Sequence, residues 1–528
     1  MRYPKFAKNK EDAIAKGYTE SIPNKSSDGY IRMIKIWEYI NDILFEFKPC
    51  FSKVTAFKWF IIVIVGFMLR SDYLGVTSII RVLNMNSDLL YLCLLHFFHS
   101  NAWKLDGIME KWIELVKSSN WIYREYGKPV LIGDGVIESK EGKKMPAVKK
   151  LRQMSENSAK PEFTWGHMFG CIGILIGNAN KLFNLPLSLR IHDGNQTIRE
   201  WTESEYIKDS HVTRLVREAF KVATLLKETC FLVLDRYYLS VNALIALKEE
   251  AWAVGIKLIT VITRVKKDCV AFEKPIPDDP DKRTVRPKRG RKAKQPPKKG
   301  NRVELFKLFT TAASQFTKSK IMMYGELKEV SYLCVDLLWG DGLFQELRFV
   351  LTLVDGRESA LVSTSLLLTP EKIIALYCCR AKIEVFFNAF KNAIKGFGYH
   401  FWSRLTPILK RRDPAKAADE KLKALGLSLT KAKTSIINTY KATEGFVMFC
   451  CIATGILQLI ALTFTNYINA APVRWLRTRT NIVPSEESTA VVLRDEFWRI
   501  YDLCPYLGII RIIRQKLHPK LPDSETAA

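Results

Sequence analysis

Two aspartates in this sequence stand where a metal site for phosphate chemistry could form. Asp134 ends the short apolar run PVLIGD, and Asp235 ends another, FLVLD. If the two runs are neighbouring strands, both carboxylates lie at the edge of the sheet where α/β proteins usually bind ligands. Carboxylate oxygens suit Mg²⁺, and two such ions can promote attack on a phosphodiester. The alternative is that each aspartate only forms a turn after its strand.

A third acid lies in the segment YCCRAKIEVFFNAFK. We expect one continuous helix over about 369–395, starting with Thr-Pro-Glu. On such a helix four polar side chains fall within one face about 60° wide: Tyr377, Arg380, Glu384 and Lys391. Glutamate can bind a metal ion, arginine can donate two hydrogen bonds to one phosphate, and lysine adds a point charge. The alternative is a solvated helix face with a single Glu–Arg ion pair.

The spacing Tyr-x2-Arg-x3-Glu-x6-Lys resembles the YREK signature of cut-and-paste DDE transposases from bacterial insertion sequences. The order of parts is also similar over about residues 126–400, with GDG, then LDR, then a β-rich segment before the glutamate. The resemblance implies a ribonuclease-H-like core that binds two Mg²⁺ ions, for which Mn²⁺ can substitute. The implied metal-binding triad is Asp134, Asp235 and Glu384, and the implied phosphate contacts are Tyr377, Arg380 and Lys391.

The resemblance also implies a reaction and its partners. Relatives nick the transposon end, form and reopen a hairpin through the freed 3′-hydroxyl, and then attack target DNA as a synaptic homodimer. The expected partners are therefore transposon-end DNA, target DNA and a second copy of this chain, in the bacterial cytoplasm at the nucleoid. Relatives that form hairpins stack an unpaired base on an aromatic residue. Trp339 is our candidate for that residue, with a core position as the alternative.

The charge balance favours a nucleic-acid partner. Lys and Arg number 81 against 54 Asp and Glu, a formal net charge of +27, which attracts polyanions. Residues 282–302 contain eleven basic residues and no acidic one. Within them, Arg289 and Arg291 flank a glycine in RPKRGRKAK, which could bind phosphates or enter an A·T-rich minor groove.

The pattern of segments predicts an α/β fold. We expect a ribonuclease-H-like catalytic core interrupted by a β-rich insertion and flanked by N- and C-terminal helical regions. The segments GVTSIIRVLNM and SDLLYLCLLHFFHS, residues 75–100, could form a helix-turn-helix or only pack the N-terminal domain. The expected domains are an N-terminal helical domain that could bind DNA (1–125), the first part of the core (126–265), a basic loop with a β-rich insertion (266–370), the helix of the YREK signature (371–400) and a C-terminal helical region (401–528).

Other function classes fit the sequence less well. Phe446–Phe464 is long and apolar enough to span a membrane, but we interpret it as a buried core helix and expect no membrane. The eleven cysteines lack the spacing of zinc ligands, so we expect reduced thiols. The remaining alternatives to a transposase are a DNA-binding descendant that no longer cuts, and a metal-dependent nuclease of the same fold.

Overall fold

The structure is a computed structural model that describes residues 27–72, 75–85, 87–153, 161–178, 181–202, 210–275, 299–409, 415–424, 426, 428–471, 473 and 482–518. The chain divides into two compact units. The first comprises Met1–Tyr123, Gly135–Lys208 and Val385–Ala528, and the second comprises Arg124–Asp134 and Asp209–Glu384. Strand β2 (Lys128–Ser139) and helix α12 (Ala381–Asn392) each contribute residues to both units.

The second unit is built on a mixed sheet. It contains the start of β2 and of α12 together with β1 (Arg124–Glu125), α8 (His211–Leu226), β6 (Cys230–Leu234), η2 (Arg236–Tyr238), α9 (Val241–Val254), β7 (Ile259–Arg264), β8 (Val270–Phe272), β9 (Arg302–Glu304), η4 (Leu305–Lys307), α10 (Leu308–Thr311), η5 (Ala313–Gln315), β10 (Thr317–Met323), β11 (Glu326–Trp339), β12 (Gln345–Val354), β13 (Arg357–Ser363) and α11 (Pro370–Cys378). Its strand order is β2-β6-β7-β13-β12-β11-β8-β9, with β1 paired to β2 and β10 to β11.

Local sequence explains the parallel part of this sheet. The five residues of β6 are all buried, as expected for a parallel strand covered on both faces. Helix α8 begins at Ser210, whose side chain accepts from the backbone N–H of Thr213, and α9 begins at Ser240 in the same way. Helix α9 ends at Gly255 in the left-handed conformation that glycine adopts without strain. The strands expected at PVLIGD and FLVLD are confirmed as β2 and β6.

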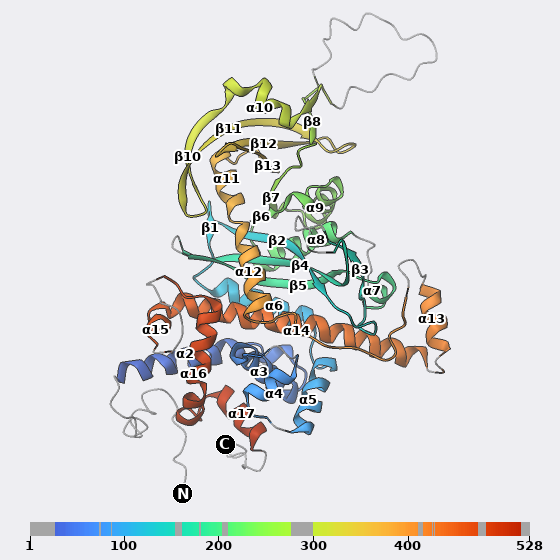
Figure 1. The fold of residues 1–528 in the computed structure, drawn as a ribbon, viewed down its shortest axis with the longest axis vertical. Coiled ribbons are helices and arrows are strands. Elements are labelled where there is room, and N and C mark those ends of the chain that lie inside the picture. The colour runs from blue at the N-terminus through green and yellow to red at the C-terminus, as the bar shows by residue number, and fades with distance from the viewer. Residues whose placement is uncertain are drawn as a thin grey trace, which may run out of the picture. The chain divides into compact units, whose positions relative to one another are not determined.

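The β-rich insertion extends the same sheet. Strand β13 pairs antiparallel with β7, and β12 and β11 follow as a hairpin whose turn contains Gly340, Asp341 and Gly342. The inserted strands have a hydrophobic core of their own, in which Leu347, Phe349 and Leu351 of β12 are fully buried. Figure 1 shows these long, curved strands beside α11. The β-rich character of this region is therefore confirmed.

The first unit is mainly helical. It contains α2 (Ser27–Phe45), η1 (Lys48–Cys50), α3 (Val54–Leu69), α4 (Thr77–Val82), α5 (Asp88–His99), α6 (Leu105–Ser118), the end of β2, β3 (Lys149–Arg152), β4 (Phe163–Asn178), β5 (Lys181–Asp193), α7 (Gln196–Thr202), the end of α12, α13 (Ala415–Lys423), α14 (Leu429–Thr463), α15 (Thr465–Ala470), α16 (Glu486–Leu503) and α17 (Gly508–Leu517). Strand β4 pairs antiparallel with β5 along most of its length and with β3 at its start.

Helix α14 is the core of the first unit. It contacts α3, α5, α6, α16 and β5, which surround it on several sides (Figure 1). Two glycines allow this close packing, because a Cβ atom at Gly445 would lie 2.4 Å from the Trp103 ring and one at Gly455 would lie 2.4 Å from the Trp112 ring. Among the described residues, α14 is the one helix long and apolar enough to cross a membrane, and its most apolar stretch is entirely buried. The interpretation of Phe446–Phe464 as a buried helix agrees with this packing.

Helices α4 and α5 occupy the possible helix-turn-helix. Leu94, Phe97 and Phe98 of α5 are buried, with the Phe98 ring 5.9 Å from that of Phe446 in α14. The exposed side of α5 carries Leu89, Leu92 and His96, and the helix contains no lysine or arginine. This arrangement favours the packing alternative over DNA recognition by α5.

Candidate active site

The first two acids lie on adjacent parallel strands, Asp134 within β2 and Asp235 directly after β6. Strands β2 and β6 pair in parallel, with Gly133 opposite Leu234. Asp134 and Asp235 are the next residues along these two strands. Strand β6 ends directly before Asp235, but β2 continues past Asp134 to Ser139, so the expectation that Asp134 ends its strand is wrong. The hydroxyl of Thr263, in the neighbouring strand β7, donates a 2.9 Å hydrogen bond to the carbonyl of Asp235 and fixes the backbone there. The expected juxtaposition of the two aspartates is therefore present.

Arg380 joins these aspartates to the third acid. Its Nη2 atom donates to Asp134 Oδ2 at 3.0 Å, and its Nη1 atom donates to Glu384 Oε1 at 2.7 Å. Its Nε atom lies 3.7 Å from Asp235 Oδ1, within ion-pair distance. One guanidinium thus contacts three carboxylates, one from within strand β2, one directly after strand β6 and one from helix α12. A solvated helix face with one Glu–Arg pair would account for only one of these three contacts.

Burial makes this cluster electrostatically strong. The Arg380 side chain is 17% exposed, against 18% for Asp134 and 27% for Asp235, while Glu384 is 61% exposed. Burial alone would lower the pKa of Arg380, but the three neighbouring acids outweigh it and raise that pKa above its ordinary value. The guanidinium therefore stays charged and compensates carboxylates that would otherwise repel one another.

Tyr238, three residues after Asp235, is buried close enough to the site to be affected by its charges. Burial, followed by the charge of Asp134, raises the pKa of Tyr238 well above its usual value, so the phenol stays protonated. Its oxygen shares a 2.9 Å hydrogen bond with Nε2 of His211 at the start of α8. This hydrogen bond joins the residues directly after Asp235 to the start of α8.

The segment that contains Arg380 differs from the expectation. We expected one continuous helix, but α11 ends at Cys378 and α12 begins at Ala381. Between them the backbone N–H groups of Cys379, Arg380, Lys382 and Ile383 each bond to the carbonyl three residues earlier. This is the tighter 3₁₀ pattern, so the angular positions assumed for one α-helix are wrong across residues 379–383. The tightened turn nevertheless places Arg380 and Glu384 beside the aspartates.

Tyr377, in the last turn of α11, has a second basic neighbour. Burial raises the pKa of Tyr377 to about 12, while the nearby charges of Arg264 and Arg380 act in the opposite direction. The hydroxyl is therefore protonated near neutral pH and can donate a hydrogen bond. Arg264 is a site residue that the sequence reading missed. It ends β7 as Asp235 follows β6, so its place at a strand end was a usable signal.

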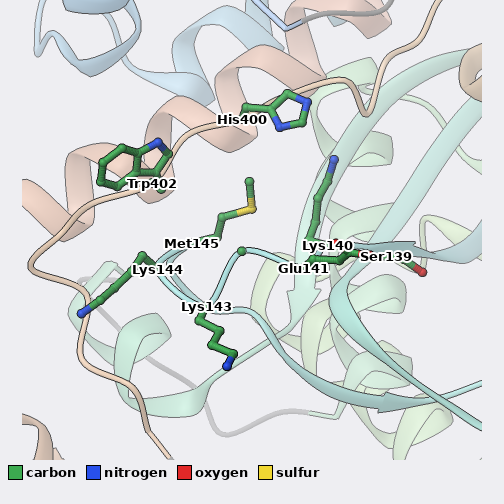
Figure 2. Close-up of a pocket in the computed structure, with 9 residues that line it drawn as sticks. Ser139, Lys140, Glu141, Lys143, Lys144, Met145, His400 and Trp402 are labelled. Carbon is green, nitrogen blue, oxygen red and sulfur yellow. The ribbon is translucent and has the colours of Figure 1, made fainter.

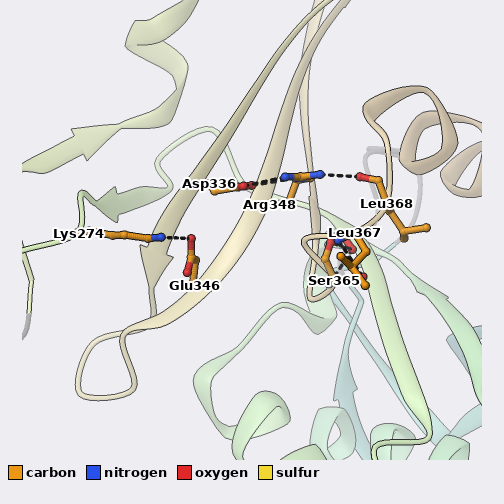
Figure 3. A network of polar contacts seen from close by, with 8 residues as sticks. Lys274, Asp336, Glu346, Arg348, Ser365, Leu367 and Leu368 are labelled. Atoms are coloured by element: carbon orange, nitrogen blue, oxygen red, sulfur yellow. Dashed lines mark hydrogen bonds and ion pairs between the residues drawn. The ribbon is translucent and has the colours of Figure 1, made fainter.

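An ion-pair network in the insertion positions α11. Arg348 of β12 donates two hydrogen bonds, 2.9 and 2.8 Å long, to Asp336 on the adjacent strand β11. It also donates a 2.9 Å bond to the carbonyl of Leu368, directly before the N-cap residue of α11. Figure 3 shows Arg348 between these two partners, with Lys274 and Glu346 forming a separate pair nearby. The start of α11 is thus tied to the sheet.

The other predicted site residues have different partners or fall outside the described residues. Lys391 belongs to the first unit, where its Nζ atom donates to the carbonyl of Ile137 at 3.3 Å and pairs with Glu138 at 3.5 Å. Trp339 is half-buried and packs against the hydrophobic core of the insertion. Arg289 and Arg291 lie outside the described residues. The DNA contacts expected of these four residues stay predictions.

The donor set suits a hard divalent cation. Three carboxylates offer oxygen ligands of the kind that Mg²⁺ prefers. Within the described ranges, no three His, Cys, Asp or Glu side chains are gathered closely enough to hold a metal ion, because the guanidinium of Arg380 lies between the acids. An ion bound by all three acids must therefore take over contacts that Arg380 makes.

Comparison with known proteins agrees with this chemistry over part of the chain. No curated protein matches the sequence. A family model does match, and the matched residues include Asp235, Tyr377, Arg380 and Glu384. The match starts after Asp134, so the assignment of Asp134 to the site depends on the strand register and on its contact with Arg380. Residues 198–398, less than half of the chain, match the family described as Transposase DDE domain, and this match indicates an enzyme that transfers phosphoryl groups on DNA.

Proposed function

We propose that this protein is a DNA transposase that cleaves DNA at the ends of a mobile element and joins the freed ends to target DNA. The observation that carries the proposal is the convergence of Asp134, Asp235 and Glu384 on Arg380. The proposed route is cut-and-paste with a hairpin intermediate, carried out by a homodimer in the bacterial cytoplasm, as in insertion-sequence transposases with a YREK signature.

The three acids are proposed to hold two Mg²⁺ ions, or Mn²⁺ in their place. Such ions promote in-line attack by a water molecule or a 3′-hydroxyl and stabilise the leaving oxygen. Asp134 and Asp235 are suited to this role because the parallel sheet fixes both backbones. Glu384 is more exposed and lies on a helix, so it can reorient when Arg380 exchanges one partner for another.

The basic and phenolic groups are proposed to bind the DNA backbone. Arg380 can donate two parallel hydrogen bonds to a phosphate once an ion has taken its place among the acids. The protonated hydroxyl of Tyr377 can donate to another phosphate oxygen, and Arg264 adds a positive charge beside it. Lys391 is proposed to contact a further phosphate. These residues would orient the scissile bond without reacting themselves.

A cleavage assay tests the proposal. The substrate is DNA that carries the flanking ends of the source element, incubated with Mg²⁺ or Mn²⁺ and with wild type, Asp134→Asn or Asp341→Asn. Asp341 is the matched control because its side chain is 93% exposed and lies in the hairpin turn. We expect metal-dependent nicks or hairpins at the element boundary with wild type and the control, and none with Asp134→Asn.

The other outcomes identify the alternatives. Cleavage without joining to target DNA indicates a nuclease of the same fold. Binding without cleavage indicates a DNA-binding protein that has lost activity. Absence of both binding and cleavage contradicts the proposal.

A further inference from the structure

A hollow of about 760 Å³ lies in the first unit, between the loop after β2 and the segment 397–406. Its size falls in the range of roughly 300–1,000 Å³ that ligand pockets occupy. It is lined by Lys140, Lys143, Lys144, Met145, His400 and Trp402, with Glu141 as an acidic residue of the lining. Figure 2 shows Trp402 and His400 on one wall and the loop with Lys143, Lys144 and Met145 on the other.

The segment 397–406 presents its side chains alternately. Tyr399, Phe401 and Ser403 are buried, whereas the residues between and after them are exposed: His400, Trp402 and Arg404. This period of two is that of an extended chain with one face against the core. The buried face is well packed, since the Phe401 ring lies 5.2 Å from that of Phe98 and 6.1 Å from that of Phe446. The exposed face therefore has a fixed position.

Hydrogen bonds hold this segment on the loop after β2. Lys140 Nζ donates to the carbonyl of Phe397 at 2.7 Å and lies 4.1 Å from the centre of the Tyr399 ring. Lys144 Nζ donates to the carbonyl of Thr406 at 3.0 Å, and its own carbonyl accepts from the N–H of Ser403. The Tyr399 hydroxyl shares a 2.7 Å hydrogen bond with buried His167. The pocket is thus built before any ligand arrives.

Trp402 is 65% exposed although the backbone on both sides of it is anchored. A large indole held open to solvent in a pocket that Lys143 also lines, with Arg404 exposed two residues further along, combines a stacking surface with cationic groups. That combination is how proteins bind single-stranded nucleic acid, with bases stacked on aromatic rings and phosphates near lysine or arginine. A paired base within a duplex does not expose its face, so the ring favours an unpaired base. The same strand β2 that carries Asp134 ends at Ser139, a residue of the pocket lining.

We propose that this pocket binds an unpaired nucleotide of DNA, with its base stacked on Trp402 and its phosphate near Lys143 and Arg404. The proposal rests on the proposed function only in that the ligand is DNA. It assigns a second DNA contact, in the first unit and separate from the acids around Arg380.

Fluorescence anisotropy with the full chain tests this proposal. The probes are a labelled 12-nucleotide single strand and the matching duplex, both at the same salt concentration. We expect Trp402→Ala to weaken single-strand binding by about tenfold or more, the usual effect of removing one stacking partner. Trp402→Phe keeps a ring and is expected to retain most of the affinity. The matched control is Trp252→Ala, because Trp252 lies in α9 of the other unit and is 88% exposed.

The salt dependence of binding and the comparison of single strand with duplex provide two further measurements. Lys143→Ala is expected to reduce the slope of log affinity against log salt for the single strand by about 0.7, the value for one bound phosphate. Three results would each overturn the proposal. The first is that Trp402→Ala binds the single strand as tightly as wild type does. The others are that Trp252→Ala loses as much single-strand affinity as Trp402→Ala, or that Trp402→Ala loses as much affinity for the duplex as for the single strand. No metal or cleavage enters these measurements, so their failure is distinguishable from failure of the proposed transposase activity.

Discussion

Arg380 Nη2 lies 3.0 Å from Asp134 Oδ2, although the two residues are 246 positions apart in the chain. Through Arg380, an aspartate outside the matched domain becomes part of the same charge cluster as Asp235 and Glu384. The contact also assigns two roles to one arginine. It compensates the acids in this structure and is proposed to bind phosphate during the reaction.

Replacing Arg380 by Gln is expected to destabilise the second unit and to increase its response to Mg²⁺. Loss of a charged hydrogen-bond donor typically costs about 1.5–3 kcal/mol, and three carboxylates would remain close together. A divalent ion can then bind without displacing a guanidinium. The measurement is thermal unfolding with and without Mg²⁺, with Lys382→Gln as the neighbouring control. A smaller Mg²⁺-induced shift in Arg380→Gln than in wild type would contradict the exchange of partners.

Glu384→Gln is expected to abolish cleavage while DNA binding survives. The change removes a metal-binding charge but keeps the shape of the side chain. Metal ions contribute several kcal/mol to such a transition state, so the rate should fall on the order of 100-fold or more. Single-turnover cleavage and anisotropy on the same substrate separate the two effects. The control is Glu346→Gln, since Glu346 pairs with Lys274 at 2.7 Å in the insertion, and it should cleave normally.

Arg348→Ala tests the support of α11. Its three hydrogen bonds join β12 to β11 and to Leu368, the residue before the N-cap of α11. Their removal is expected to loosen the start of α11 by about 1–2 kcal/mol, because only part of the network is shielded from water. Hydrogen–deuterium exchange should increase over residues 364–378. Lys318→Ala, which breaks an exposed pair with Glu329, should leave that segment unchanged, and equal exchange in both variants would count against the role of Arg348.

His167 predicts an acid-sensitive first unit. Burial lowers its pKa to about 4, below the value of about 6.5 in an unfolded chain. The unfolded state therefore binds more protons between these values. The stabilisation from neutral His167 is complete above about pH 6.5 and is lost as the pH falls towards 4, by up to about 3 kcal/mol. Melting temperatures from pH 4 to 7 should vary less steeply in His167→Gln, whereas exposed His96→Gln should follow wild type.

The basic segment 282–302 is expected to bind phosphates. Changing both Arg289 and Arg291 to Ala should weaken duplex binding and reduce the slope of log affinity against log salt by roughly 0.9 for each phosphate that is no longer bound. Titrations at several salt concentrations measure this slope. An unchanged slope would mean that these arginines do not bind the DNA backbone, and an effect limited to A·T-rich duplexes would favour the minor groove.

The sequence predicted the strands around Asp134 and Asp235 because each is a short apolar run that ends at a polar residue. It failed at residues 379–383, where YCCRAK contains neither glycine nor proline and so gives no sign of the tightened turn. The contact between Arg380 and Asp134 could not be predicted either, because it joins residues 246 positions apart and depends on the register of β2 against β6. Trp339 stays a prediction for base stacking, whereas Trp402 was not singled out from the sequence, because its place beside a pocket depends on how the segment around the buried Phe401 packs.

The position of α14 in the chain has a consequence for biosynthesis. Helix α3 and its neighbours leave the ribosome hundreds of residues before α14, the helix that buries their apolar side chains. At synthesis rates of about 5–20 residues per second, this surface waits roughly 20–80 seconds for its partner. Residues 124–134 and 209–384, by contrast, are complete before α14 is made. A nascent chain that stalls before residue 429 therefore carries a folded second unit attached to an open apolar surface, which makes it a substrate for chaperones or proteases.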